Sequence, residues 1–355
     1  MLGSLFGWIS LLFEPLAFQV PLIEPQPRLK AENDIAIPVQ GPWQDIITGH
    51  YAIPPVLKIH DRNSVVKWSW QREDVTQPLP PLIQSGLYSG FNDATDMKWM
   101  RGGRSVAAVY SALIVVINHT PDQPSTDKKI TFALNRANEV LNNAHTIEPL
   151  PGDRLAVGTT GQRPWDGLRA IHAMIWDEQG QMLWATGTDA AADGSDPVPA
   201  YGVIQGYPFD AETGLLSVDE AYRFRFPEYY DIDVEWVFLV SNDIGLHAFD
   251  IDKMKFTAEY DEVVEKYMPG FEVTTNDRHG ITRQGEYVEL PQSDLKGFSL
   301  APDGSFLYTQ SLWRLYRGNY TSLVVDGVRH QIMKGNEIYR SRWFGDIDGW
   351  PKPKT

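Results

Sequence analysis

The stretch "NNAHTIEPLPGDRLAVGTTG" at positions 142–161 is followed closely by "IHAMIWDEQGQMLWATGTD" at 171–189. When the two are aligned on His145 and His172, the apolar residues and threonines of their second halves coincide. Each copy predicts a strand, a tight turn and a second strand, because Pro-Gly-Asp and Gln-Gly are turn sequences between apolar runs. The chain therefore repeats a β-hairpin that begins near a histidine.

Further copies of this hairpin occur along the chain. "LKGFSLAPDGSFLYTQ" at 295–310 places Lys296 at the histidine position, and "DMKWMRGGRSVAAVY" at 96–110 is a looser match. "VFLVSNDIGLHAFDID" at 237–252 retains only the second strand and the residues after it. Hairpins that recur at spacings of about 40–60 residues predict a β-propeller, in which each repeat forms one four-stranded blade.

The predicted fold is an all-β propeller of about six blades, with seven as the alternative count. Residues 1–46 form an apolar, proline-rich N-terminal segment, and residues 47–350 form one propeller domain. The expected blades are 47–91, 92–136, 140–168, 171–227, 232–262 and 295–345. Two of them, 140–168 and 232–262, are too short for four strands and are expected to be incomplete. Helical periodicity is nearly absent, and 261–268 is the best short helix candidate.

The hairpin alignment also predicts which side chains pack between blades. A shift of one residue in strand phase would exchange the buried and exposed sets. The expected packing residues are Ile147, Leu155, Val157, Met174, Ile175 or Trp176, Leu183, Phe298, Leu300, Phe306 and Tyr308.

The composition excludes several classes of function. The chain has 31 Lys and Arg against 46 Asp and Glu, a net charge of −15, which repels nucleic acid. It has no cysteine, so disulfides, thiolate metal sites and cysteine nucleophiles are excluded. Its 12 tryptophans and 15 tyrosines suit sugar binding, but β-rich cores use aromatic residues heavily as well.

The N-terminal run "MLGSLFGWISLLFEPLAFQVPL" resembles the core of a signal peptide, although no Lys or Arg precedes it and Glu14 interrupts it. We therefore expect an extracellular protein, with a cytoplasmic location as the alternative. The run is too short and too broken for a transmembrane helix. A monomer is expected.

The recurring histidine position is the leading candidate site. Innermost propeller strands line the central channel, so equivalent strand starts in successive blades converge at one of its mouths. His145, His172 and Lys296 would then form a general acid–base cluster or, with a divalent cation, a metal site. In the alternative interpretation each histidine only packs against the backbone of a neighbouring blade.

Two other segments carry candidate ligand-binding residues. The insert "NDRHGITRQGEY" at 276–287 offers planar guanidinium groups for a carboxylate, although a solvated loop explains it equally. The loop "QRPWDG" at 162–167 offers a sugar platform, unless its tryptophan packs between blades. The residues concerned are Arg163, Trp165, Arg278, His279, Arg283 and Tyr287.

The segments "WSWQ", "AHTIEPLPGDRLAVGTTG" and "KGFSLAPDGS" resemble a fungal and bacterial family of β-propeller-like proteins of unknown function. The resemblance extends from about residue 50 to the C-terminus and implies a fold but no activity. In architecture, the repeat of a histidine and a turn is similar to propeller enzymes that cleave uronic-acid polysaccharides by β-elimination. That similarity implies a polysaccharide or oligosaccharide partner.

These features are consistent with two functional hypotheses. The first is a carbohydrate-active or carbohydrate-binding propeller, with a uronate-directed lyase as its catalytic form. A lyase needs a base for the proton α to the carboxylate and a positive group to neutralise that carboxylate. A hydrolase needs two opposed carboxylates, and the sequence indicates no such pair. The second hypothesis is a non-catalytic scaffold for protein interactions.

Overall fold

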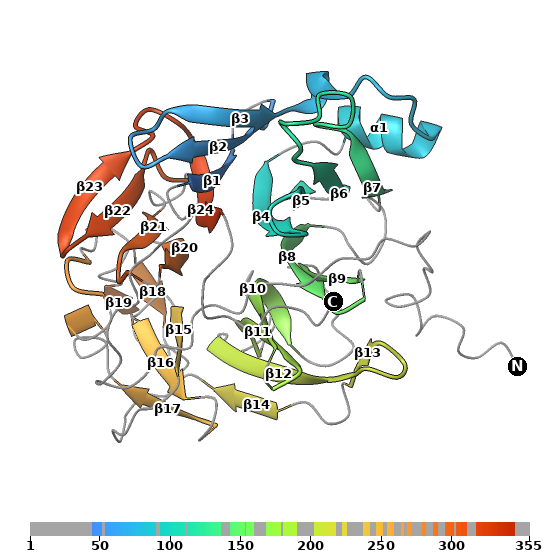
Figure 1. Ribbon diagram of the computed structural model, residues 1–355. Helices are drawn as coiled ribbons and strands as arrows, with labels where there is room; N and C mark the ends of the chain where they lie inside the picture. The colour runs from blue at the N-terminus through green and yellow to red at the C-terminus, as the bar shows by residue number, and fades with distance from the viewer. Residues whose placement is uncertain are drawn as a thin grey trace, which may run out of the picture.

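The computed structural model describes residues 45–344, except for 52–53, 90–92, 111–112, 136–142, 153, 160–167, 179, 190–201, 218–221, 226–236, 242–245, 251–253, 259–263, 266–267, 272–278, 282–286, 290–294, 302 and 311–316. Its sheets are arranged around a centre in a propeller-like ring (Figure 1). The helical elements of the described residues include helix α1 (Pro81–Ser89) and a 3₁₀ turn at Arg72–Asp74. The predicted all-β class is thus confirmed.

The first sheet joins the two ends of the described chain. Its order is β24-β1-β2-β3, and its strands are β1 (Asp45–His50), β2 (Leu57–Asp61), β3 (Val66–Trp70) and β24 (Ile338–Phe344). The predicted last blade, 295–345, is therefore wrong at its end, because β24 pairs with β1 and not with its sequence neighbours. Pairing the last strand with the first protects strand edges that would otherwise stay open.

Three more sheets have four or more strands. One is β4 (Ala94–Met100), β5 (Ser105–Tyr110), β6 (Leu113–Asn118) and β7 (Ile130–Asn135). Another is β20 (Leu295–Leu300), β21 (Phe306–Gln310), β22 (Thr321–Val325) and β23 (Val328–Ile332). The third has five strands, β10 (Arg169–Asp177), β11 (Met182–Thr188), β12 (Gly202–Asp210), β13 (Leu215–Leu216) and β14 (Tyr222–Arg225).

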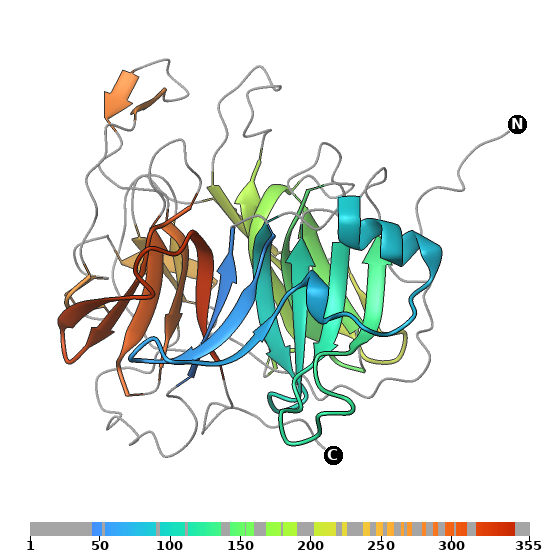
Figure 2. The same ribbon diagram turned by 90° about the horizontal axis from the view of Figure 1, so that it is seen from above.

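The remaining sheets are smaller. They are β8 (Ala144–Leu150) with β9 (Arg154–Thr159), then β15 (Val237–Ser241), β16 (Leu246–Asp250) and β17 (Lys255–Ala258), and finally β18 (His279–Ile281) with β19 (Tyr287–Glu289). The described parts of the two regions predicted to be incomplete therefore hold two and three strands. The β18–β19 hairpin projects away from the ring (Figure 2).

Among the described residues, five of the inner strands are linked by contacts with one another. β8 contacts β4 on one side and β10 on the other, and β24 contacts both β4 and β20. Each of these five strands is the first in the order of its sheet. Residues near their starts are thereby brought toward one another from distant parts of the sequence.

The core between the sheets is rich in aromatic residues. Trp70, Trp99, Trp176, Trp184 and Trp343 are all fully buried. Many of the tryptophans therefore stabilise the fold by burying apolar area and are not available as sugar platforms.

Most of the predicted packing residues are buried. Leu155 and Val157 are partly buried and pack against the sheet that begins with β4, while the side chain of Phe298 lies outside the described part. The buried ones are Ile147, Met174, Ile175, Trp176, Leu183, Leu300, Phe306 and Tyr308.

The helix prediction was wrong in one respect. Helix α1 was not expected, because nine residues give too little periodicity to detect. Proline at its first position and buried Leu87 are the features that fit a helix there. The predicted helix at 261–268 lies mostly outside the described residues. In the described part of the chain, no helix has the length and hydrophobicity needed to cross a membrane.

Candidate functional site

An irregularity in strand register occurs near the start of each of these five strands. In β4, Ala94 faces Tyr110 while Asp96 faces Val109, so Thr95 is an extra residue without its own partner in the ladder. In β8, Ala144 faces Thr159 and Thr146 faces Gly158, which makes His145 the extra residue. Such β-bulges redirect a side chain, and they are frequent beside functional sites.

The other three inner strands share this feature. Lys296 is the extra residue of β20, and Tyr339 is the extra residue of β24. In β10 the irregular stretch spans positions 170–172 and ends at His172. The residues aligned by the sequence repeat, His145, His172 and Lys296, therefore all lie at register irregularities near the starts of their strands. Tyr339 occupies the same position in a strand that the sequence analysis had not aligned.

The bulges bring four of these side chains into one group, here called the bulge cluster: His145, His172, Lys296 and Tyr339. The imidazole rings of His145 and His172 lie 4.6 Å apart, centroid to centroid, in an edge-to-face arrangement. The proximity predicted for the two histidines is therefore confirmed. The Tyr339 hydroxyl is hydrogen-bonded to Nε2 of His145, and Lys296 Nζ lies 5.4 Å from the centre of the Tyr339 ring.

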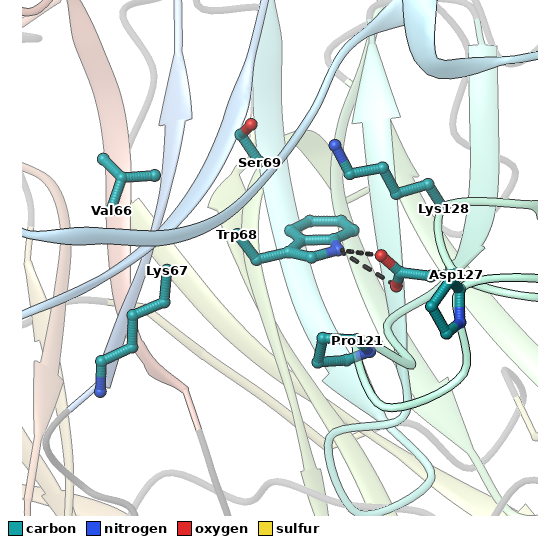
Figure 3. Close-up of a pocket in the computed structure, with 8 residues that line it drawn as sticks. Val66, Lys67, Trp68, Ser69, Pro121, Asp127 and Lys128 are labelled. Carbon is teal, nitrogen blue, oxygen red and sulfur yellow. Dashed lines mark hydrogen bonds between the residues drawn. The ribbon is translucent and has the colours of Figure 1, made fainter.

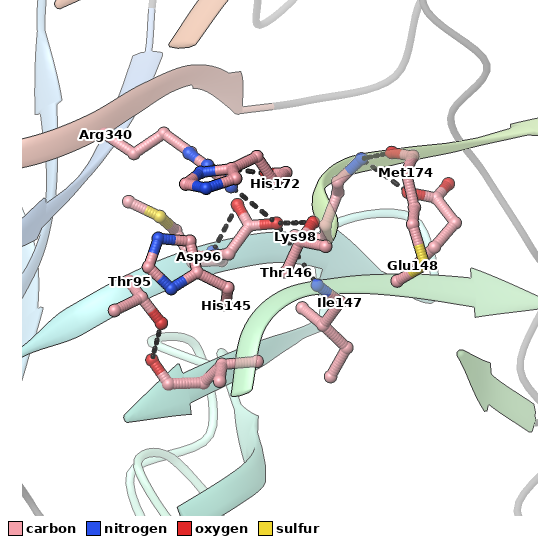
Figure 4. A network of polar contacts seen from close by, with 12 residues as sticks. Thr95, Asp96, Lys98, His145, Thr146, Ile147, Glu148, His172, Met174 and Arg340 are labelled. Carbon is pink, nitrogen blue, oxygen red and sulfur yellow. Dashed lines mark hydrogen bonds and ion pairs between the residues drawn. The ribbon is translucent and has the colours of Figure 1, made fainter. Parts of the chain in front are cut away.

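A buried carboxylate lies directly behind the bulge cluster (Figure 4). Asp96 is fully buried and accepts hydrogen bonds from Thr146 Oγ1 at 2.6 Å and from the Ile147 amide at 3.2 Å. Arg342 donates to it at 3.0 and 3.1 Å, and Arg340 forms an ion pair with it at 3.2 Å. Burial alone would raise the pKa of Asp96, but the two guanidinium groups hold it well below its usual range.

A second buried ion pair lies further along the same strands. Lys98 of β4 pairs with Glu148 of β8, and both side chains are almost completely buried. Lys98 also donates to the Met174 carbonyl at 3.2 Å, and Glu148 accepts from the Trp176 amide at 3.1 Å (Figure 4). Burial raises the pKa of Glu148 to about 7, although Lys98 opposes this change.

The surroundings of His145 are positively charged. Burial, together with the charges of His172, Arg340 and Lys296, holds the pKa of His145 well below its ordinary value. The imidazole is therefore neutral at neutral pH, and the positive groups around it oppose its protonation. Its Nδ1 atom is shielded from solvent and makes no hydrogen bond in the described structure.

The charge balance of the site favours an anionic ligand over a cation. The four cationic side chains Arg340, Arg342, Lys98 and Lys296 outnumber the carboxylates of Asp96 and Glu148. Within the described residues, no group of three or more potential metal ligands is found. The expected divalent cation thus gains no support, whereas a carboxylate would be attracted to this site.

The remaining sequence candidates are not assembled at this site by the described residues. Arg163, Trp165, Arg278 and Arg283 lie outside the described part of the chain. The backbones of His279 and Tyr287 lie in the β18–β19 hairpin, where their side chains are not described. Their proposed roles in binding a sugar or a carboxylate remain predictions.

A depression of about 500 Å³ lies elsewhere, between β3 and the loop that precedes β7 (Figure 3). Its charged groups are already paired. Trp68 Nε1 donates to the Asp127 carboxylate at 3.2 Å, and Lys128 pairs with Asp74 at 3.0 Å. The depression therefore lacks the chemistry of the bulge cluster. Its lining residues are Val66, Lys67, Trp68, Ser69, Pro121, Pro124, Asp127 and Lys128.

Comparisons with known proteins identify no family. No protein-family model matches this chain, and no curated protein matches it either. The solved structures that are similar to this chain include the following three. The first is a functionally unknown protein from Desulfotomaculum acetoxidans, with 9% identity, 83% of this chain and 98% of that one covered, and a TM-score of 0.44.

The second is a hypothetical selenium-binding protein from Sulfolobus tokodaii, with 10% identity, 88% and 97% coverage, and a TM-score of 0.40. The third is the dihydro-heme d1 dehydrogenase NirN, with 12% identity, 89% and 78% coverage, and a TM-score of 0.37. At these TM-scores the fold description rests on the chain's own sheet topology. None of the three is described as a polysaccharide lyase, so the expected resemblance to that class gains no support from them.

Proposed function

We propose that the bulge cluster binds a carboxylate-bearing carbohydrate and acts on it as a uronate-directed lyase. The observation that carries this proposal is the convergence of two histidines, a lysine and a tyrosine from four inner strands. A buried, net positive layer behind them complements an anionic sugar. An extracellular location, which the apolar N-terminal run suggests, suits a polymeric substrate of this kind.

The chemistry assigned to the cluster is β-elimination. The exposed His172 accepts the proton α to the carboxylate. Neutral His145, whose ring Tyr339 holds through Nε2, supports the His172 ring by edge-to-face contact. The carbon–oxygen bond at the β position breaks as a carbon–carbon double bond forms. The His172 imidazolium formed in this way returns its proton to the departing oxygen. Lys296 stabilises the negative charge that develops on the carboxylate.

Hydrolysis by a carboxylate pair fits this site less well. Asp96 and Glu148 are its buried acidic residues, and each is held in an ion pair. A glycosidase needs one carboxyl group on each side of the scissile bond, with access to the sugar. Because neither carboxylate is exposed, elimination is the better assignment.

The test is depolymerisation of acidic and neutral polysaccharides, followed by the ultraviolet absorbance of the unsaturated uronate product. Wild-type protein should release this product from a polyuronate only. His145→Ala and His172→Ala should abolish the release while leaving thermal unfolding nearly unchanged. If both variants are instead less stable by about 1–3 kcal/mol and no saccharide binds, the histidines are packing residues and the lyase proposal fails. A non-catalytic scaffold is then the better interpretation.

We also infer six blades. The described strands form seven sheets. All of them except the β18–β19 hairpin are assigned here to the ring of Figure 1. Because that hairpin projects from the ring, we assign it to an insertion and not to a blade. An experimental structure in which β18–β19 gains further strands within the ring would overturn this count.

A further inference from the structure

One buried arginine contacts the strands that carry most of the bulge cluster. Arg340 donates from Nε to the carbonyl of Lys296 at 2.8 Å and from one terminal nitrogen to the carbonyl of His172 at 2.8 Å. Its other terminal nitrogen forms the ion pair with Asp96 at 3.2 Å. Since Arg340 directly follows Tyr339 in β24, its planar guanidinium fixes β10, β20, β4 and β24 relative to one another.

Asp96 extends this set of contacts to the remaining histidine. The carboxylate accepts hydrogen bonds from the hydroxyl of Thr146 and the amide of Ile147, which follow His145 in β8. The backbone beside every member of the bulge cluster is therefore attached to Arg340, either directly or through Asp96.

The neighbouring strand makes room for this arginine. A Cβ atom added to Gly297 would lie 2.9 Å from Cγ and 3.4 Å from Cδ of Arg340. A contact of 2.9 Å with the stem of a buried side chain requires that side chain to move. Gly297 follows Lys296 in β20, so glycine is needed there for the close approach of Arg340.

We propose that Arg340 is the positioning residue of the bulge cluster. It sets the separation of His172 and Lys296 and, through Asp96, the position of His145, without touching the ligand. This inference rests on the proposed function. The positioning role of Arg340 also predicts the arrangement of the bulge cluster in the ligand-free protein. The positioning role and the lyase proposal can therefore fail separately.

Arg342 provides a matched control. It lies two residues further along β24, is also buried, and binds the same Asp96 carboxylate. The hydrogen bonds described for it go to Asp96 and not to a carbonyl of the bulge cluster. Arg340→Lys and Arg342→Lys each keep one buried positive charge, but each loses the planar fork. Their stability losses should therefore be similar, while their effects on the site should differ.

The first measurement is turnover of a polyuronate. Arg340→Lys should lower kcat/KM by roughly 100-fold, because misplacement of catalytic groups by about 1 Å has an effect of that size. Arg342→Lys should lower it by less than about 10-fold. Gly297→Ala, which retains Arg340 but displaces its stem, should resemble Arg340→Lys. Equal losses in the two lysine variants would overturn the assignment.

The second measurement does not depend on activity. Imidazole NMR signals of the ligand-free protein report the contact between His145 and His172. Arg340→Lys and Gly297→Ala should shift both signals, and Arg342→Lys should leave them nearly unchanged. Arg340→Met should also raise the pKa of His145, because one positive neighbour of the imidazole is removed. The groups that face His145 are His172, Tyr339, Lys296, Arg340 and Asp96. Unmoved signals in the Arg340 variants would refute the positioning role even if the lyase assignment held. With those shifts present, absence of turnover in the wild type would refute only the lyase assignment.

Discussion

At the scale of single residues, Tyr339 has two roles in the site, because its ring packs against a neighbour and its hydroxyl forms a hydrogen bond. Tyr339 is buried, and its ring stacks on Tyr51 at 5.1 Å between centroids. Its hydroxyl binds Nε2 of His145, which leaves Nδ1 as the imidazole nitrogen without a hydrogen bond. One side chain thus links the stability of β24 to the orientation of His145, which contacts the proposed base His172.

Replacing Tyr339 by phenylalanine separates these two roles. Phe keeps the stacked ring but removes the hydrogen bond to His145, so the free energy of unfolding should fall by only about 1 kcal/mol. Turnover should fall far more, because His145 loses its orientation and no longer supports the base His172. The measurement is urea unfolding together with kcat on a polyuronate. Tyr51→Phe is the control, since its hydroxyl is bonded to Asp93 and not to His145. Equal turnover in the two variants would contradict the role of the hydroxyl.

At the scale of strands, the inner bulges shape the site, whereas an outer strand with only one partner lowers local stability. The bulges redirect side chains toward the centre, whereas strand β9 pairs only with β8 among the described strands. Its side chains are mostly half-buried, in contrast to the fully buried β5, which pairs on both sides. Strand β9 is therefore less supported than β5.

Hydrogen exchange should reveal this difference. Amides of β9 should exchange faster than those of β5, because β9 can open without breaking a second ladder. Protection factors measured by mass spectrometry on peptides covering 154–159 and 105–110 give the comparison. The β11 peptide, 182–188, is the control, since β11 also pairs on both sides. Equally slow exchange in β9 and β5 would show that the β9 edge is covered.

The strands and the bulges differ in how far the sequence predicts them. Hairpins at 144–159 and 295–310 follow from local turns and alternating apolar residues, so they could be predicted. The contact between Asp96 and Arg342 joins residues 246 positions apart, and no local pattern marks it. Tyr339 was missed for a related reason. Its strand pairs with β1 from the other end of the chain, so it lacks the hairpin turn on which the repeat was aligned.

At the scale of the whole molecule, closure of the ring and assembly of the site depend on the same strand. β24 pairs with β1 and supplies Tyr339, Arg340 and Arg342. Near its end, Trp343 is 1% exposed and donates from Nε1 to the Ser299 carbonyl at 3.1 Å. The last strand is thereby held to β20 as well as to β1.

Trp343→Ala tests this closure. Removing a buried indole leaves a cavity and an unpaired carbonyl, so the free energy of unfolding should fall by about 3–5 kcal/mol. Loss of the β24 anchor should also weaken ligand binding, although Trp343 lies outside the bulge cluster. Urea unfolding gives the stability, and Val328→Ala, at a position 56% exposed, is the control. A loss no larger than that of Val328→Ala would exclude a closing role for Trp343.

The buried histidines give the whole molecule a pH-dependent stability. Burial lowers the pKa of His50 to about 3, lowers that of His60, and holds that of His145 well below its ordinary value. Below about pH 6.5 the unfolded chain binds protons at these positions and the folded protein does not. Stability should therefore be present above that pH and be lost as the pH falls.

Glu148 acts in the opposite direction, because its pKa is raised to about 7. Between pH 4.5, the ordinary pKa of a glutamate, and about pH 7, the folded protein binds a proton at Glu148 that the unfolded chain does not bind. This stabilisation offsets the effect of one of the three histidines. We therefore expect the urea midpoint to be lower at pH 5 than at pH 7. His50→Gln should reduce the corresponding difference in the free energy of unfolding by up to about 1.4 kcal/mol per pH unit. A midpoint at pH 5 equal to or above that at pH 7 would contradict this assignment, since two uncompensated histidines must then be protonated in the folded protein.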